Sequence, residues 1–160
     1  MEKTLVKLYN ELGNKIVSMI PGQWEKIYYL GEVEGGRKSC SSVFYFIEQN
    51  AEEINRSHDI PTKYQVSDKI YRQLNIEACN ILLKIYDCFV DNGQIPWEQL
   101  KMSIDKSGGF KVDFVYDIIS KCDNSQIERE IIWAYDICGY MPQEGTYPRK
   151  VLERLLKARK

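Results

Sequence analysis

Three aspartates, Asp105, Asp113 and Asp117, fall at nearly even steps through the apolar segment "WEQLKMSIDKSGGFKVDFVYD". Carboxylates at such spacing could bind a metal ion, act as a general acid–base pair, or be displayed to a basic partner. On one extended strand, Asp113 and Asp117 share a face but lie roughly 13 Å apart. Metal ligands converge to about 2–2.6 Å from the ion, and paired-acid hydrolysis needs carboxyls within about 10 Å. The spacing favours a solvated face or an acidic docking face over catalysis.

His58 is the only histidine and lies in "SHD" with Ser57 and Asp59. Adjacent side chains point in different directions, so these three residues cannot form the relay that activates a nucleophile. A metal-assisted hydrolase that uses His58 with Asp105, Asp113 and Asp117 remains an alternative, and it requires folding to bring these groups together. The chain has no G-x-x-x-x-G-K-[ST] phosphate loop and no C-x-x-C pair. We therefore predict no cofactor and no metal.

Aromatic residues flank the same segment and suggest protein recognition. Trp97 precedes the aspartates and Tyr116 lies among them. Exposed aromatics are rigid anchors at protein interfaces, although core packing is the ordinary role of such residues in a small domain. The candidate partner-binding residues are Asp105, Asp113, Asp117, Trp97 and Tyr116.

The charge is unevenly distributed along the 160 residues. The segment 147–160 carries one acidic residue and six basic ones, namely Arg149, Lys150, Arg154, Lys157, Arg159 and Lys160. The rest holds 16 Lys/Arg and 22 Asp/Glu, a balance of −6. An acidic body favours a basic partner over direct nucleic-acid binding. A small nucleic-acid-binding module that uses the basic C-terminal helix remains a second alternative.

Periodicity predicts the elements that must position these residues. Apolar residues recur at helical spacing in four segments and alternate along strands in two hairpins. The helices are expected over residues 3–20, 67–92, 125–138 and 148–159, and the hairpins over 24–49 and 100–117. The order α-β-β-α-β-β-α-α predicts an α+β fold, an antiparallel sheet of two hairpins with helices packed mainly on one face. The length predicts a single domain over residues 1–160.

The chain contains no apolar run of the roughly 20 residues that would cross a bilayer. Its start, "MEKTLVKLYNELGNK", is a charged amphipathic pattern without the apolar core of a signal peptide. We expect a cytoplasmic protein with no membrane partner.

Four landmarks occur together and in order: "MIPGQWEKIYYLGEV", "SHDIPTKYQVSDKIY", "PWEQLKMSIDKSGGFKVDFVYD" and "EREIIWAYDICGYMP". In sequence and spacing they resemble the YezG-like antitoxin (immunity) family. The likeness runs from about Met19 to Pro142, and the final helix carries little of it.

The resemblance implies a function without chemistry of its own. That family is associated with neutralising LXG-type toxins, which Gram-positive bacteria export by type VII secretion and whose toxic domains are often nucleases. The implied protein is a non-enzymatic inhibitor that binds a cognate toxin stoichiometrically. An acidic, aromatic-bearing surface would suit a nuclease, because a nuclease is basic where it meets phosphate. The sequence predicts no oligomeric state.

Overall fold

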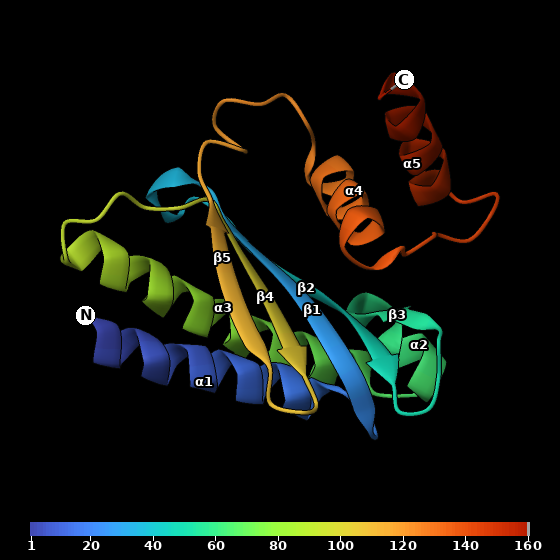
Figure 1. Ribbon diagram of the computed structural model, residues 1–160, viewed down its shortest axis with the longest axis horizontal. Helices are drawn as coiled ribbons and strands as arrows, with labels where there is room; N and C mark the ends of the chain where they lie inside the picture. Colours follow the sequence, from blue (N-terminus) through green and yellow to red (C-terminus); the bar gives the residue numbers. More distant parts are fainter. Residues whose placement is uncertain (160) are drawn as a thin grey trace. The chain divides into compact units, whose positions relative to one another are not determined.

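The computed structural model describes residues 1–159, and the chain forms two compact units, Met1–Ser120 and Lys121–Lys160 (Figure 1). The expectation of a single domain stays a prediction.

The first unit is built on one five-stranded antiparallel sheet of order β3-β2-β1-β4-β5. Its strands are β1 (Trp24–Val33), β2 (Cys40–Glu48), β3 (Ile54–Arg56), β4 (Gln99–Asp105) and β5 (Phe110–Val115). The first strand pairs with β2 on one side and β4 on the other, and so it joins the two predicted hairpins into one sheet. The short strand β3 adds an edge that the predicted order lacks.

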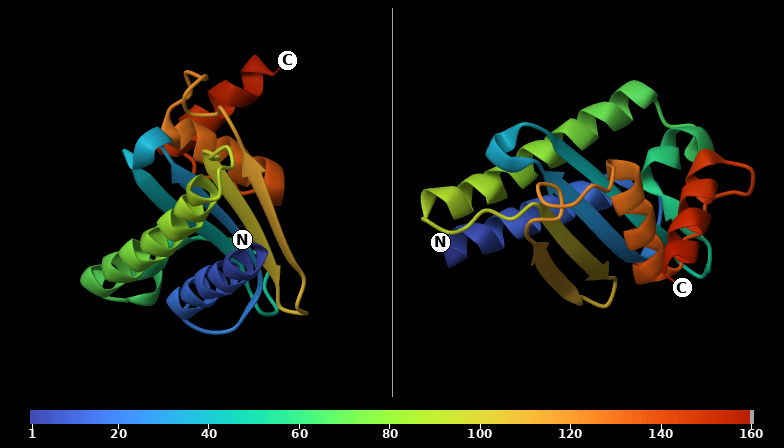
Figure 2. Two further views of the ribbon diagram at one scale, coloured as in Figure 1. Left: turned by 90° about the vertical axis from the view of Figure 1, so that its left-hand side faces the viewer. Right: turned by 90° about the horizontal axis from the view of Figure 1, so that it is seen from above.

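Two long helices, α1 (Glu2–Met19) and α3 (Asp68–Asp91), cover one face of the sheet (Figures 1 and 2). The short helix α2 (Ile60–Tyr64) and the 3-10 turns η1 (Gly35–Arg37) and η2 (Ser57–Asp59) lie in the connections. Ser67 caps α3, since its hydroxyl accepts a hydrogen bond from the Ile70 N–H at 3.4 Å.

The core of this unit lies between the two helices and the sheet. It contains Leu8, Leu12 and Ile16 of α1, Leu82 and Ile85 of α3, and the strand residues Ile27, Tyr29, Phe44, Phe46, Leu100 and Met102. Gly31 lets α3 approach β1, because a Cβ atom there would lie 2.6 Å from Leu82 Cδ2. Trp24 packs against this core too, although simple alternation places it on the opposite face. The pairing of β1 with β2 shifts register between Trp24 and Lys26, and the extra residue turns Trp24 over.

The second unit is a pair of helices, α4 (Gln126–Cys138) and α5 (Tyr147–Ala158). Ser125 and Glu128 form a capping box at the start of α4, and Gly139 ends the helix in a left-handed conformation. Arg159, which directly follows α5, forms an ion pair with Asp136 of α4 at 2.6 Å. The antiparallel sheet and the five α-helices found in residues 1–159 confirm the α+β class, with β3, α2 and the two 3-10 turns added to the expected order. Within residues 1–159 no helix is long and apolar enough to cross a membrane.

Candidate partner-binding surface

Asp105 closes the turn between β4 and β5. Its carboxylate accepts hydrogen bonds from the Ser107 N–H at 3.0 Å and the Ser107 hydroxyl at 2.9 Å. Lys26 Nζ lies 3.6 Å from the other carboxylate oxygen, across the sheet on β1. The Ser107 hydrogen bonds, and after them Lys26, lower the pKa of Asp105. This carboxylate is engaged in local structure and holds the hairpin turn.

Asp113 lies in the middle of β5 and is surrounded by lysines. It is paired in register with Lys101 of β4, and Lys111 Nζ lies 3.5 Å from its carboxylate. Pairing places Lys26, Asp105, Lys101, Lys111 and Asp113 on the same face of the sheet. The expected acidic face is therefore of mixed charge, with three lysines beside two aspartates. Alternation placed Asp105 and Asp113 correctly on one face, but the docking hypothesis left out the lysines that the strand register places beside them.

Asp117 does not share a strand face with Asp113, so that expectation is wrong. Strand β5 ends at Val115, and Asp117 has a left-handed backbone with φ 58°. The alternation of a strand cannot continue through such a residue. Tyr116, at the same point of the chain, leaves 46% of its surface exposed. Tyr116 and Asp117 thus form a short exposed segment beyond the strand.

Glu98 fixes this segment. It is 7% exposed, and its carboxylate accepts hydrogen bonds from the backbone N–H of Ile119 at 2.8 Å and of Ser120 at 3.2 Å. Burial alone would raise the pKa of Glu98, but the hydrogen bonds outweigh it and the pKa is lowered. Sequence reasoning did not single out Glu98, because the donors are backbone groups more than twenty residues away.

Trp97 is not an exposed anchor. Its side chain has no accessible surface, and its ring packs against Tyr86, Phe89 and Phe114 at centroid distances of 5.5, 6.3 and 5.3 Å. The ring fills the space between α3 and the β4–β5 hairpin. The alternative of ordinary core packing is correct for this residue, and Trp97 is therefore no longer a candidate partner-binding residue.

The hydrolase alternative requires groups that the fold separates. His58 lies in η2, directly after the edge strand β3, whereas Asp113 lies on β5 at the opposite edge. Four strand spacings of about 4.8 Å put these edges roughly 19 Å apart. The His58 ring contacts Tyr71, with Nδ1 3.0 Å from the Tyr71 hydroxyl. In residues 1–159 no three His, Cys, Asp or Glu side chains are placed to hold a metal ion.

The basic C-terminal helix is partly neutralised within its own unit. Arg149 pairs with Glu153 at 3.1 Å, and Arg154 with Glu128 at 3.3 Å. Arg159 is bound to Asp136, as described above. Lys160 lies outside the described residues. Three of the six expected phosphate-binding cations are thus engaged by carboxylates, which weakens the nucleic-acid alternative.

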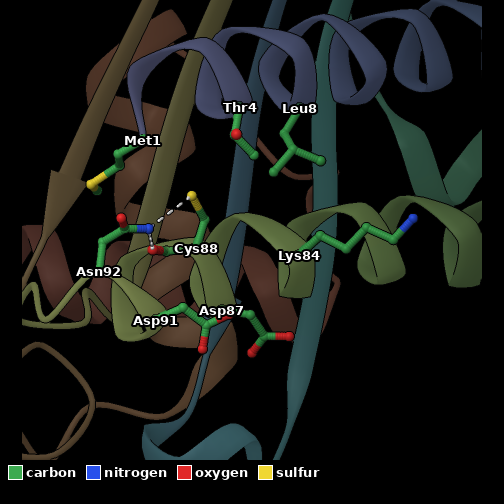
Figure 3. Close-up of a pocket in the computed structure, with 8 residues that line it drawn as sticks. All are labelled: Met1, Thr4, Leu8, Lys84, Asp87, Cys88, Asp91 and Asn92. Carbon is green, nitrogen blue, oxygen red and sulfur yellow. Dashed lines mark hydrogen bonds between the residues drawn. The ribbon is translucent and has the colours of Figure 1, made fainter.

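A groove of about 450 Å³ opens between the start of α1 and the end of α3 (Figure 3). Thr4 and Leu8 of α1 face Cys88 of α3 and Asn92, the residue that follows α3, across it. The Asn92 side chain donates a hydrogen bond to the Cys88 carbonyl oxygen at 2.7 Å. The remaining lining residues are Met1, Lys84, Asp87 and Asp91. Sequence reasoning missed this groove, since it depends on how two helices pack. Of the acidic residues in the lining, Asp87 is paired with Arg37, whose Nε lies 3.5 Å from its carboxylate.

These features define a class of protein. The functional candidates lie on an exposed sheet edge and a turn, and their polar groups are engaged in ion pairs and caps. Such an arrangement can present a surface to another macromolecule.

Comparison with known proteins agrees with that class. The sequence matches the family described as "Immunity protein YezG-like" over residues 5–152. It is 31% identical to the Immunity protein YezG of Bacillus spizizenii over 150 residues, which cover 94% of this chain and 91% of the relative. Identity to the Immunity protein YezG of Bacillus subtilis is 33% over 137 residues, covering 86% and 89%. The Type VII secretion system protein EsaG of Staphylococcus aureus is 28% identical over 152 residues, covering 95% and 92%. The chain belongs to the YezG-like family of immunity proteins.

Proposed function

We propose that this protein is the cytoplasmic immunity partner of a toxin exported by type VII secretion, and that it neutralises the toxin by stoichiometric binding. The family match over residues 5–152 carries the proposal. One relative is itself named as a type VII secretion system protein.

We further propose that the toxin domain is a nuclease and that it contacts the exposed segment after β5. A nuclease is basic where it binds phosphate, and the first unit is acidic, with 17 Asp/Glu against 14 Lys/Arg in residues 1–120. Tyr116 supplies an exposed aromatic ring, exposed Asp117 follows it in the chain, and Glu98 binds the backbone at Ile119 and Ser120 just beyond them. A fixed aromatic beside an acidic group suits a basic protein surface. Asp113 lies at the margin of this surface, whereas Asp105 holds the hairpin turn at the other end of β5.

Co-expression with the toxin encoded beside its gene tests the function. We expect wild-type protein to protect the cells and to form a one-to-one complex that survives gel filtration. If cells die and no complex is recovered, the immunity function is wrong. A complex with a toxin that leaves nucleic acids intact would reject only the nuclease assignment.

Point variants test the surface separately. Tyr116→Ala should weaken toxin binding about tenfold or more, as expected for an aromatic anchor. Asp117→Asn should slow association at low salt, because it removes steering charge, and asparagine tolerates the left-handed backbone there. Glu52→Gln, at an exposed acidic residue between β2 and β3, is the matched control. If Tyr116→Ala and Asp117→Asn both bind like Glu52→Gln, this surface is not the interface, whatever the co-expression result.

A further inference from the structure

The strand β5 is the longer free edge of the sheet. The order β3-β2-β1-β4-β5 leaves two edges, and β3 is only three residues long and leads directly into η2. Figure 2 shows β5 at the outer margin of the sheet, with no other element of the first unit beyond it. An edge strand exposes a row of unpaired N–H and C=O groups that can pair with another strand.

The alternation of hydrogen-bonded pairs between β4 and β5 identifies which backbone groups of β5 face outward. Asp105 N–H donates to the Gly109 carbonyl at 2.8 Å, so these two residues are a bonded antiparallel pair. Bonded pairs alternate along the ladder, and therefore Lys111 and Asp113 also direct their backbone groups to β4. The backbone groups of Phe110, Val112 and Phe114 point away from it. Among the strands of residues 1–120, β5 pairs with β4 alone.

The side chains of this edge are self-complementary. The strand begins Phe110-Lys111-Val112-Asp113-Phe114, with hydrophobic ends, a hydrophobic centre and opposite charges on either side of the centre. If a second copy pairs antiparallel with Val112 opposite Val112, Phe110 meets Phe114 and Lys111 meets Asp113 twice, by symmetry. No other central residue produces this match.

We infer that two copies of this chain associate through β5, which pairs antiparallel with the same strand of the second copy and is centred on Val112. The outward groups of Phe110, Val112 and Phe114 then form bonded pairs with their counterparts. Lys111 and Asp113 of the second copy become a non-hydrogen-bonded pair, the kind in which Cα atoms approach to about 4.5 Å.

The exposure of the β5 side chains agrees with a second copy of the chain as the partner of this edge. The side chains of Lys111 and Asp113 are 72% and 58% exposed, and Phe110 is 48% exposed. Edges that avoid pairing usually carry charge that repels a second strand. Here a lysine and an aspartate are placed so that a second copy attracts both. An extended strand from a different protein has no such match built into it.

Sedimentation equilibrium of the full chain without toxin tests this inference. One strand pair is a small interface, so the range should extend from about 1 µM to about 500 µM. Wild type should change from monomer to dimer within that range. Lys111→Asp and Asp113→Lys each place like charges opposite one another, and each should raise the dimer dissociation constant at least tenfold.

Combining the two substitutions, or mixing the two single variants, should restore dimerisation. The double variant Lys111→Asp/Asp113→Lys restores opposite charges and should dimerise like wild type. An equal mixture of the two single variants should form a heterodimer, because one strand then carries two aspartates and the other two lysines. A structural defect in either variant would not be repaired by mixing.

Val112→Pro tests the backbone contribution. Its N–H points outward, so proline should leave the β4–β5 ladder intact while removing the central intermolecular hydrogen bonds. Circular dichroism checks the fold. A wild-type chain that stays monomeric to the highest concentration overturns the inference, as does a double variant as monomeric as the singles. If the wild type is monomeric and the Val112→Pro variant loses toxin binding, the partner of the β5 edge is a strand of the toxin and not a second copy. None of these outcomes bears on whether the protein neutralises a toxin.

Discussion

Glu98 should control both the stability of the first unit and the surface proposed for toxin binding. Its buried carboxylate holds two backbone N–H groups, of Ile119 and Ser120, just beyond the exposed segment at Tyr116. We expect Glu98→Gln to lower the free energy of unfolding by about 2 kcal/mol. Because Tyr116 would lose a fixed position, toxin affinity should also fall.

The magnitude follows from the hydrogen bonds that change. A hydrogen bond to a charged group contributes about 1.5–3 kcal/mol, against about 0.5–1.5 kcal/mol for a neutral one. Glutamine keeps one acceptor oxygen and presents an NH2 group where the second oxygen was, so both N–H groups bind less strongly. With a urea slope of about 1–3 kcal/mol per molar, a loss of about 2 kcal/mol moves the unfolding midpoint by about 1 M.

The pH dependence gives a second, independent signature. Since the folded-state pKa of Glu98 is lowered, its stabilisation is fully present above the unfolded-state value of about 4.3. It is lost as the pH falls through the folded-state pKa. The difference in stability between wild type and Glu98→Gln should therefore be largest at neutral pH and shrink below about pH 4.

Urea unfolding at pH 7 and at about pH 3.5 measures both effects, and amide hydrogen exchange at Ile119 and Ser120 reports local opening. Glu52→Gln is the control for loss of an exposed charge. If Glu98→Gln unfolds at the same urea concentration as the control at pH 7, the carboxylate does not hold the segment. Equal destabilisation at both pH values would show that the effect comes from packing and not from charge.

Three further results are expected. Gly31→Ala should cost about 1–3 kcal/mol in urea unfolding, because its methyl group would overlap Leu82, and an unchanged midpoint would show that α3 can move away freely. Trp97→Phe should leave toxin affinity within twofold of wild type because the ring is buried; a larger loss measured by calorimetry with unchanged stability would return Trp97 to the interface. In thiol-labelling kinetics, exposed Cys122 should react faster than buried Cys88, and the reverse order would contradict the packing of α3.

The helices were predictable from sequence because each carries its own signals. The long helix was expected over 67–92 and is found at Asp68–Asp91, since Ser67 caps its start and Asn92-Gly93 follow its end. The helix expected over 125–138 is found at Gln126–Cys138 for the same kind of reason. Caps and helical spacing are local properties of the chain, so one sequence is enough to find them.

The sheet was predictable only hairpin by hairpin. Alternation identified both hairpins, but no local pattern indicates that β1 pairs with β4 or that β3 forms the opposite edge. Trp24 shows the same limit at one residue, because a single register shift reverses its face. Trp97 precedes β4 in a segment without periodicity, and its burial depends on α3, β4 and β5 meeting around it.

The candidate surface depends most on long-range pairing, and it was therefore the least predictable part. The aspartates were identified from their types and spacing, whereas their charge environment comes from Lys26 and Lys101 on neighbouring strands. A catalytic site would have left a stronger trace, since a reaction restricts residue types and distances together. A surface that only binds another protein needs complementarity to that partner, which this chain's sequence does not contain. An exception arises where the partner is a second copy, because the same strand then supplies both complementary surfaces, as the segment from Phe110 to Phe114 does.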